Sequence, residues 1–392
     1  MYSNLELALT FDSTPALNLT RNPSHISPRF RAVAPPCESA FSPGLRRKRA
    51  LARCLPALAC AAVLVPAAPM AHAQGSLTLY GFADAGIFRP APGQPVQLGT
   101  MQRSFIGLRG SEPLGGGWAA TMNLQTRFDM GDGRLEASGA TPYFQGESTV
   151  GIRSPYGDLR FGRALTPMWQ YDWQYDSWDN FNRVGSVAWF VYHPSYRTDP
   201  YPNGPAGEYS RLNNGVFYDS PKWGGVHVHV SAGVEKNETP DAAGNRDRTR
   251  PLAASLNYDA GPWSAMLTAE RNSARDNTWF AGLAYAFSAV RLMASYSQTH
   301  LSAASQAFLG DASAKRSAAT LGVNWRVGAV TLKLSGARDF QGYGHAGTTG
   351  YVTSGLDYAL SKRTTLYGAV SYRHSRQASG GTGFGAGISH SF

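Results

Sequence analysis

Apolar and polar side chains alternate along the chain almost without interruption from Leu77 to Phe392. The segment 117–129 shows this pattern well. Its apolar positions are Ala120, Met122, Leu124 and Phe128, and its polar positions are Thr121, Asn123, Gln125 and Arg127. A period of two places successive side chains on opposite faces of an extended strand. The pattern therefore predicts an all-β chain whose strands separate an apolar from a polar environment.

Sixteen segments of this kind can be counted, and most have 8–13 residues, about the length that a tilted membrane-spanning strand needs. They are 76–88, 100–111, 117–129, 145–154, 157–164, 211–220, 225–234, 250–259, 262–271, 277–287, 290–299, 316–327, 329–338, 350–358, 364–373 and 382–392. A soluble sandwich would show the same alternation, but it would not need so many strands of this length.

The connections between these segments alternate between short and long. The short ones are 112–116, 154–157, 221–224, 259–262, 287–289 and 360–363, and the long ones are 89–99, 130–144, 165–210, 235–249, 272–276, 300–315, 339–349 and 374–381. Transmembrane barrels have this asymmetry, with tight turns on the periplasmic side and longer loops outside. With an even number of strands, both ends of the barrel segment are expected on the side of the short turns.

Backbone groups in lipid are all hydrogen-bonded only if the sheet closes, so we predict a 16-stranded antiparallel transmembrane β-barrel whose first segment pairs with its last. The expected lipid face includes Val226, Val228, Val230, Leu283, Tyr285, Phe287, Leu321, Val323 and Trp325. The expected inner face includes His227, His229, Asn324, Arg326, Lys333, Asp357 and Arg373. Aromatic residues cluster at strand ends, as at membrane interfaces, and they include Trp118, Phe128, Tyr258, Trp263, Trp279, Trp325, Tyr358 and Tyr372.

The N-terminal part of the chain has a different character. Arg46 to Arg53 is basic, Leu55 to Pro66 is apolar, and Ala71-His72-Ala73 fits a signal-peptidase site, so 46–73 is predicted to be a signal peptide and 74–392 the barrel. Residues 1–45 are polar and Pro-rich, and they match no part of a signal, which is consistent with an over-long gene start or a leader. After residue 73, no apolar stretch is long enough for a transmembrane helix.

Composition adds two constraints. All three cysteines, Cys37, Cys54 and Cys60, precede the barrel segment, so thiol chemistry is excluded from the barrel itself. The first 73 residues hold 8 of the 36 Lys and Arg and 3 of the 26 Asp and Glu, which leaves 28 basic and 23 acidic residues and a net charge of +5. These basic residues are spread along the chain and form no tract of the kind that binds nucleic acid.

Several motifs occur in order along the barrel segment, namely Ser76–Gly86 (SLTLYGFADAG), Ile106–Trp118 (IGLRGSEPLGGGW), Leu159–Arg163 (LRFGR) with Thr166-Pro167, Val216–Pro221 (VFYDSP), Leu356–Thr364 (LDYALSKRT) and the terminal Phe392. These motifs resemble those of general porins of the β-proteobacterial type. Each motif is loose alone, but together they follow the family order over the whole segment from Ser76 to Phe392. The resemblance implies a homotrimeric, water-filled outer-membrane channel in which the third long loop, here about 165–210, folds into the pore and narrows it.

The resemblance also implies basic wall residues opposite acidic loop residues. By position, the pore-lining basic candidates are Arg109, Arg127, Arg153, Arg160 and Arg163, and the constriction-loop acidic candidates are Asp172, Asp176 and Asp179. The sequence departs from the family pattern at Gln145-Gly146-Glu147 and at Phe217, where basic residues are common, which leaves the charge balance of the pore open. The alternative for each Arg is a hydrated lumen side chain without a selective role.

Loop 165–210 carries an unusual aromatic run. Trp169, Tyr171, Trp173, Tyr175 and Trp178 could stack on sugars or aromatic solutes, or they could simply pack the loop against the barrel wall, and packing is the favoured interpretation. His227 and His229 share a strand face, but two ligands without a third make a poor metal site, so no metal and no cofactor are expected. No spaced nucleophile motif is present, which argues against an enzyme.

These features predict a porin for passive diffusion of small hydrophilic solutes and ions, with a weak preference for anions because of the basic balance. The alternative is a substrate-selective channel that uses the aromatic run 169–181. An outer-membrane enzyme or an adhesin would need a catalytic cluster or an added domain, and neither is evident. The expected partners are outer-membrane lipid, lipopolysaccharide and the barrel-assembly machinery, the last through Phe392.

Overall fold

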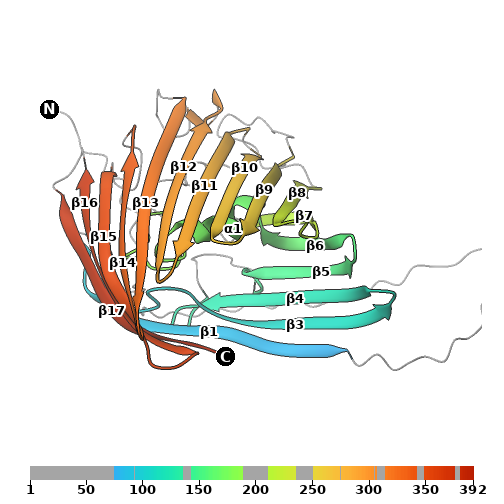
Figure 1. Ribbon diagram of the computed structural model, residues 1–392, viewed down its shortest axis with the longest axis horizontal. Helices are drawn as coiled ribbons and strands as arrows, with labels where there is room; N and C mark the ends of the chain where they lie inside the picture. Colours follow the sequence, from blue (N-terminus) through green and yellow to red (C-terminus); the bar gives the residue numbers. More distant parts are fainter. Residues whose placement is uncertain are drawn as a thin grey trace, which may run out of the picture. The chain divides into compact units, whose positions relative to one another are not determined.

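The barrel is described by a computed structural model that covers residues 75–91, 93–135, 143–188, 211–234, 250–273, 275–303, 305–306, 314–341, 348–375 and 380–392. Within these residues, sixteen long antiparallel strands and one short strand form a single sheet (Figure 1). The predicted leader and signal peptide lie outside the described residues. No described helix has the length and apolar character needed to cross a membrane.

The long strands are β1 (Ser76–Arg89), β3 (Ser104–Gly115), β4 (Trp118–Phe128), β5 (Glu147–Ser154), β6 (Gly157–Leu165), β7 (Arg211–Asp219), β8 (Val226–Gly233), β9 (Leu252–Ala260), β10 (Trp263–Arg271), β11 (Asn277–Phe287), β12 (Val290–His300), β13 (Lys315–Val327), β14 (Val330–Asp339), β15 (Thr348–Ala359), β16 (Thr364–Ser375) and β17 (Gly381–Ser391). Each pairs with its sequence neighbour, and β1 also pairs with β17. The predicted 16-stranded closed barrel is confirmed.

Most strand boundaries lie within two residues of the prediction, but β3 begins four residues later than expected. The cause is Asp84, whose Oδ1 accepts hydrogen bonds from the backbone N–H groups of Met101 (2.8 Å) and Gln102 (2.7 Å). These bonds turn the chain before β3 can begin. The pattern also missed three short elements, namely β2 (Gln97–Gly99), the helix α1 (Pro167–Tyr171) and the 3-10 helix η1 (Asp172–Tyr175).

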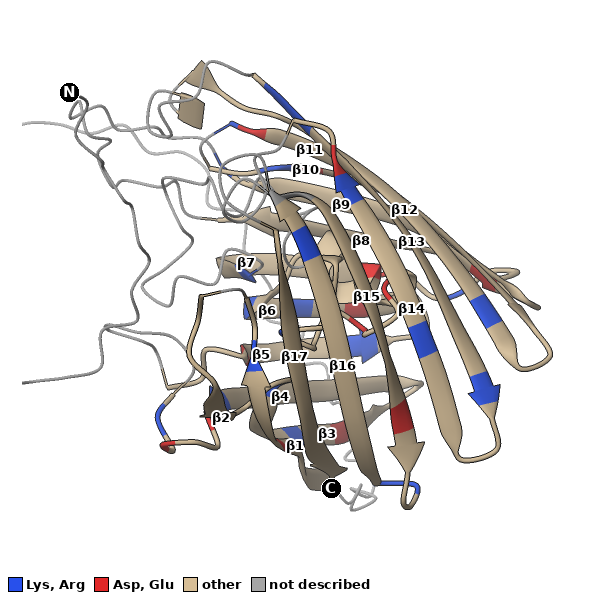
Figure 2. Ribbon diagram, turned by 90° about the vertical axis from the view of Figure 1, so that its left-hand side faces the viewer, with Lys and Arg blue, Asp and Glu red and all other residues tan. Residues whose placement is uncertain are grey.

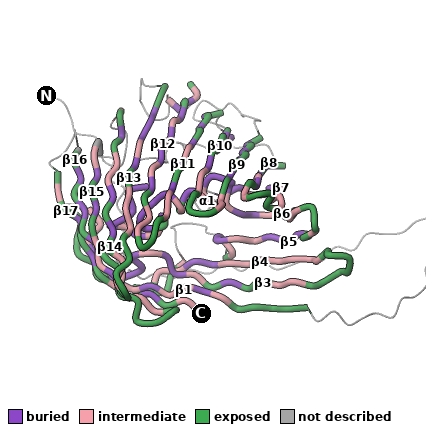
Figure 3. The backbone as a smooth tube through the Cα atoms, in the orientation of Figure 1, coloured by how far each residue is buried: buried purple, intermediate pink, exposed green. Residues whose placement is uncertain are grey.

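The two faces of the sheet differ as the alternation predicts. In β9, Leu256 is 51% exposed, whereas its neighbours Ser255 and Asn257 are buried. Exposed and buried positions alternate along most strands in Figure 3. Charged residues occupy few strand positions, and long uncharged stretches separate them (Figure 2). Apolar side chains thus cover the outside, and polar ones line the inside.

Closure of the barrel extends to the last residue. Phe82 to Arg89 of β1 pair with Phe384 to Ser391 of β17, and Gly81 and Phe392 exchange two backbone hydrogen bonds of 3.1 Å. The ring of Phe392 covers Gly81 so closely that a Cβ there would lie 2.3 Å from the ring. Glycine at position 81 therefore lets the terminal aromatic ring close the seam.

Deleting Phe392 is expected to lower the yield of folded barrel by about tenfold. The deletion removes two backbone hydrogen bonds and a packed aromatic ring, a combined loss of about 3–5 kcal/mol from the closing strand. The heat-modifiable band in gel electrophoresis measures the folded fraction. Phe340→Ala removes a half-exposed ring next to a long connection and is the control. An unchanged folded fraction after the deletion would contradict this role.

Candidate functional site

The described part of the third long connection, residues 166–188, lies against the inner face of the barrel, and we call it the docked segment. At its start, the Met168 backbone N–H donates to Glu270 Oε1 of β10 (3.0 Å). Farther along, Arg291 of β12 donates to the Gln174 carbonyl (3.2 Å), and Tyr351 of β15 donates to the Val184 carbonyl (2.7 Å). These three contacts come from β10, β12 and β15, so the docked segment is attached to the wall at intervals from β10 to β15. Residues 189–210 lie outside the described residues.

Three inner-face glycines let the docked segment approach the wall. A Cβ added to Gly282 of β11 would lie 2.4 Å from the ring of Tyr175, far inside the contact limit. A Cβ on Gly322 of β13 would lie 2.5 Å from Ser177 Oγ, and one on Gly355 of β15 would lie 2.6 Å from the ring of Trp178. These strands therefore carry glycine where the segment 175–178 packs.

Arg160 joins two carboxylates on the opposite inner wall. Its guanidinium pairs with Glu147 of β5 (Nη1–Oε1, 3.1 Å) and with Asp219 of β7 (Nη2–Oδ2, 2.8 Å). Glu147 also accepts a 2.7 Å hydrogen bond from Asn123 of β4. All three ion-pair side chains keep about a fifth of their surface exposed. Arg160 is thus a partly hydrated wall cation held in place by two anions.

The same network continues to the histidine pair of β8. His229 Nδ1 lies 2.5 Å from Asp219 Oδ1, His227 Nδ1 lies 2.6 Å from His229 Nε2, and His227 Nε2 lies 2.9 Å from Asp259 Oδ2 of β9. The two imidazoles thus form a continuous chain of close polar contacts between Asp219 and Asp259. Within the described residues, no group of three or more potential ligands has the geometry of a metal site.

Tyr171 of α1 connects the docked segment to this network. Its hydroxyl lies 3.2 Å from His229 Nδ1, and its ring lies 4.1 Å from the imidazole, centroid to centroid. Burial raises the pKa of Tyr171 above its usual range, with the charge of Asp219 acting in the same direction. The hydroxyl therefore stays protonated and can serve as a hydrogen-bond donor.

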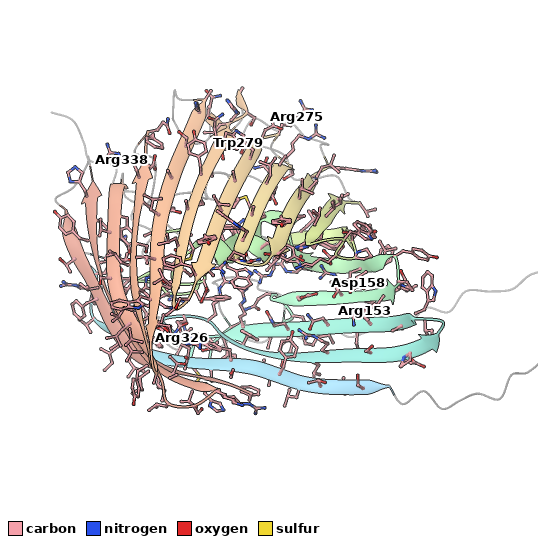
Figure 4. All side chains as sticks on the ribbon, viewed as in Figure 1. Arg153, Asp158, Arg275, Trp279, Arg326 and Arg338 are labelled. Atoms are coloured by element: carbon pink, nitrogen blue, oxygen red, sulfur yellow. The ribbon has the colours of Figure 1, made fainter. Side chains whose placement is uncertain are left out.

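The other four predicted basic residues have different settings. Arg109 is exposed on β3 and stacks on the Tyr80 ring (4.7 Å). Arg127 and Arg163 are buried at the ends of β4 and β6, where Arg163 Nε donates to the Gln145 carbonyl (2.9 Å). Arg153 lies beside the short β5–β6 turn and pairs with Asp158 (3.0 Å), as Figure 4 shows. The structure thus brings Arg160, but not Arg153, next to the docked segment.

The predicted loop acids are not equivalent. Asp172 and Asp176 are buried inside the docked segment, where Asp172 Oδ1 accepts from Asn180 Nδ2 (2.7 Å) and Asp176 Oδ2 from the Asn180 N–H (3.0 Å). Burial raises the pKa of both carboxyls, and for Asp172 the nearby Glu270 adds to the shift. Their role as pore-facing acids stays a prediction, which their burial disfavours.

Asp179 differs because its side chain is exposed, and the wall charges of Lys333, Asp357 and Arg291 act on it. Desolvation raises its pKa to about 6, although the charge of Lys333 opposes the shift. Lys333 of β14 itself pairs with Asp357 of β15 (2.7 Å) and lies 4.6 Å from the ring centre of Trp178. Asp179 is therefore the loop acid whose charge can act on the open interior.

The aromatic run divides between the two interpretations. Tyr175 and Trp178 are 2% and 3% exposed and pack against the wall, as the packing interpretation expects. Trp169 and Tyr171 are half-buried, and the ring of Tyr171 already packs against the imidazole of His229. Trp173 is 41% exposed, and its indole donates to the Gln170 carbonyl (2.9 Å). Stacking on solutes stays a prediction, and Trp173 offers the accessible face for it.

The candidate set missed several charged wall residues, among them Glu147, Asp219, Glu270, Arg291, Lys333 and Asp357. They stand at inward positions of their strands, beside or opposite a basic candidate or the docked segment. The signal was available, because a charged residue on the polar face of a membrane strand lines the interior. Lys333 and Asp357 were in fact expected on the inner face, but not as an ion pair.

Comparisons with known proteins agree with this geometry. The family model described as "Gram-negative porin" matches residues 57–378. The chain belongs to the Gram-negative porin family. Outer membrane porin protein 32 of Delftia acidovorans is 31% identical over 337 residues, which cover 81% of this chain and 90% of that protein. An outer membrane porin protein of Bordetella pertussis is 26% identical over 62% of this chain and 69% of its own length.

Solved structures show the same fold. The anion-selective porin from Comamonas acidovorans has a TM-score of 0.65 and 24% identity, and the match covers 81% of this chain and all of that one. Salmonella typhi OmpF has a TM-score of 0.58 and 13% identity, covering 81% of this chain and 97% of that one. The protein is thus an outer-membrane channel for passive diffusion and not an enzyme, and its location is the bacterial outer membrane.

Proposed function

We propose that this porin prefers small anions and that loop 165–210 narrows its pore. The observation that carries the proposal is the difference between the basic wall residues and the acidic loop residues in how far they face the interior. The wall presents an exposed Arg109 and, paired with Glu147 and Asp219, Arg160 to the interior, whereas the loop acids Asp172 and Asp176 are buried inside the docked segment and do not face the pore. An exposed arginine on the wall, opposite a loop whose two acids are buried, lowers the energy of an anion at the waist. The name of the Comamonas acidovorans relative, an anion-selective porin, points in the same direction.

Liposome swelling tests this proposal with solutes of equal size and different charge. Vesicles that contain the folded barrel should admit the small carboxylate gluconate faster than the cation glucosamine, and neutral glucose at an intermediate rate. Faster entry of glucosamine would contradict the anion preference. Equal rates for all three would show that the wall charges have no selective role.

The charge of Asp179 predicts a pH dependence. Because its pKa is raised to about 6, the carboxyl is mostly ionised at pH 7.5 and mostly protonated at pH 5. Protonation removes one negative charge from the interior, so the chloride-to-potassium permeability ratio is expected to rise by about twofold as the pH falls through 6. Reversal potentials at several pH values measure this ratio. In Asp179→Asn, the chloride-to-potassium permeability ratio should have its low-pH value at every pH. If the ratio of this variant still changed near pH 6, another group would be responsible for the titration.

We also propose the partners of the channel. A homotrimer is supported by relatives such as OmpT of Vibrio cholerae, one structure of which is described as a trimer form. Outer-membrane lipid and lipopolysaccharide fit the exposed apolar outside, and Phe392 at the barrel seam is a suitable signal for the assembly machinery. The predicted signal peptide, residues 46–73, would direct export.

A further inference from the structure

The outside of the barrel carries an apolar groove over β11 to β15. Its volume is about 590 Å³, and apolar atoms form nearly all of its surface. Directly paired residues form one row across it: Leu283, Ala294, Leu321, Gly336 and Val352. Large and small side chains alternate in this row, so Ala294 and Gly336 form a floor between three ridges. We call this hollow the outer groove.

The outer groove leads to a basic side chain. Arg338 stands two residues beyond Gly336 on β14, about 7 Å along the strand and on the same outward face. Its paired neighbours are small, with Ala319 on one side and Gly350 on the other. Arg338 is exposed, and no described residue forms a hydrogen bond or ion pair with it. Figure 4 shows it near the end of β14 that is remote from the short turns.

Further outward basic and aromatic groups lie at the same end of the barrel. Arg271, Asn277, His300 and Lys315 are paired in one row across β10 to β13. Below them, the rings of Trp279 and Tyr296 lie 5.1 Å apart. Basic groups above aromatic rings are typical of the lipid headgroup region. This end carries the long connections, which in such barrels face the outer leaflet.

We propose that the outer groove and Arg338 bind a phosphate-bearing glycolipid of the outer leaflet, with an acyl chain against Gly336 and a phosphate on Arg338. The proposal rests on the outer-membrane placement and names a site for one proposed partner, lipopolysaccharide. An acyl chain fits because apolar atoms form nearly all of the groove surface, and a phosphate fits because guanidinium binds it with paired, charge-assisted hydrogen bonds.

A second copy of this chain is the rival occupant. An interface between copies would have to bring acidic groups to Arg271, Lys315 and Arg338. At the outward positions of the described strands, Glu112 is the one acidic residue, and it stands beside the short turn of β3, at the opposite end of the barrel. The charges therefore favour an anionic lipid over a protein partner.

Native mass spectrometry of the detergent-solubilised barrel with added bis-phosphorylated, hexa-acylated lipid A tests the site. Arg338→Gln is expected to weaken retention of lipid A by about tenfold, because a charge-assisted phosphate contact is lost. Gly336→Leu should weaken it by about threefold, because the new side chain fills the groove. A Cβ at Gly336 would meet nothing nearer than the Tyr351 carbonyl at 3.7 Å, so this variant should fold. The control is Arg363→Gln, which removes an exposed charge at the short β15–β16 turn and should retain lipid A normally.

Equal retention by the Arg338 and Arg363 variants would overturn the proposal. So would loss of the oligomer in Arg338→Gln with unchanged lipid retention, which would assign the surface to a second copy of this chain. If Arg338→Gln does not fold, the unaltered barrel is compared with bis-phosphorylated and dephosphorylated lipid A, and equal retention of the two overturns the phosphate contact. The proposed function can fail independently of this site. In that case the barrel would still retain lipid A in mass spectrometry but would show no anion preference in liposome swelling.

Discussion

Arg160→Gln is expected to lower the chloride-to-potassium permeability ratio by roughly fourfold. The change removes the cation that lies between Glu147 and Asp219 and leaves two carboxylates on the wall. One unit charge about 8 Å from the ion path changes the energy of an ion in water by about 0.5 kcal/mol, or about twofold in permeability. The effect has opposite signs for the anion and the cation, so it enters the ratio twice. Reversal potentials in a salt gradient measure the ratio.

Arg153→Gln is the matched control for this prediction. It makes the same chemical change, but Arg153 is 57% exposed and pairs with Asp158 beside a short turn. Exposed pairs contribute little and are screened by salt, so the ratio should stay within about 1.5-fold of the unaltered channel. Equal shifts in the two variants would mean that total charge, and not the position of Arg160, sets selectivity.

Trp178→Ala is expected to raise single-channel conductance by about 1.5-fold and to add flickering between levels. The indole is nearly fully buried, lies over Lys333 and fits against Gly355 and Gly185. Removing such a ring costs about 3–5 kcal/mol of packing, which is enough to release the middle of the docked segment from the wall. A released segment no longer holds one position, so the open cross-section should fluctuate. Single-channel recording in planar bilayers shows both effects.

Trp173→Ala tests whether this effect depends on wall packing. Trp173 lies in the same segment, but its side chain is 41% exposed. We expect its removal to leave conductance and noise unchanged. The account of the docked segment would be contradicted if both variants behaved alike, or if Trp178→Ala conducted as the unaltered channel does.

The strands could be predicted because each membrane strand shows its own alternation. The bounds of β11 were predicted without error, and those of β12 to within one residue. A period of two needs no knowledge of distant residues. The start of β3 could not be found in this way, because it depends on Asp84 binding the backbone of 101–102 across the fold.

The interior was harder to predict than the wall. The location of Arg160 on an inner strand face followed from alternation, but its partners Glu147 and Asp219 come from strands that become neighbours only when the barrel forms. The burial of Asp172 and Asp176 likewise depends on how the docked segment folds on itself. One local signal was overlooked, since Thr166-Pro167 is a typical helix start and marks the beginning of α1.

Planar bilayer recording of the refolded chain 74–392 in a potassium chloride gradient tests the central claim most directly. The account predicts stepwise, ohmic currents, grouped in threes for a trimer. The sign of the reversal potential should show that chloride is more permeant than potassium. A correctly folded, heat-modifiable barrel without conductance would contradict the open channel, and a reversal potential on the potassium side would contradict its anion preference.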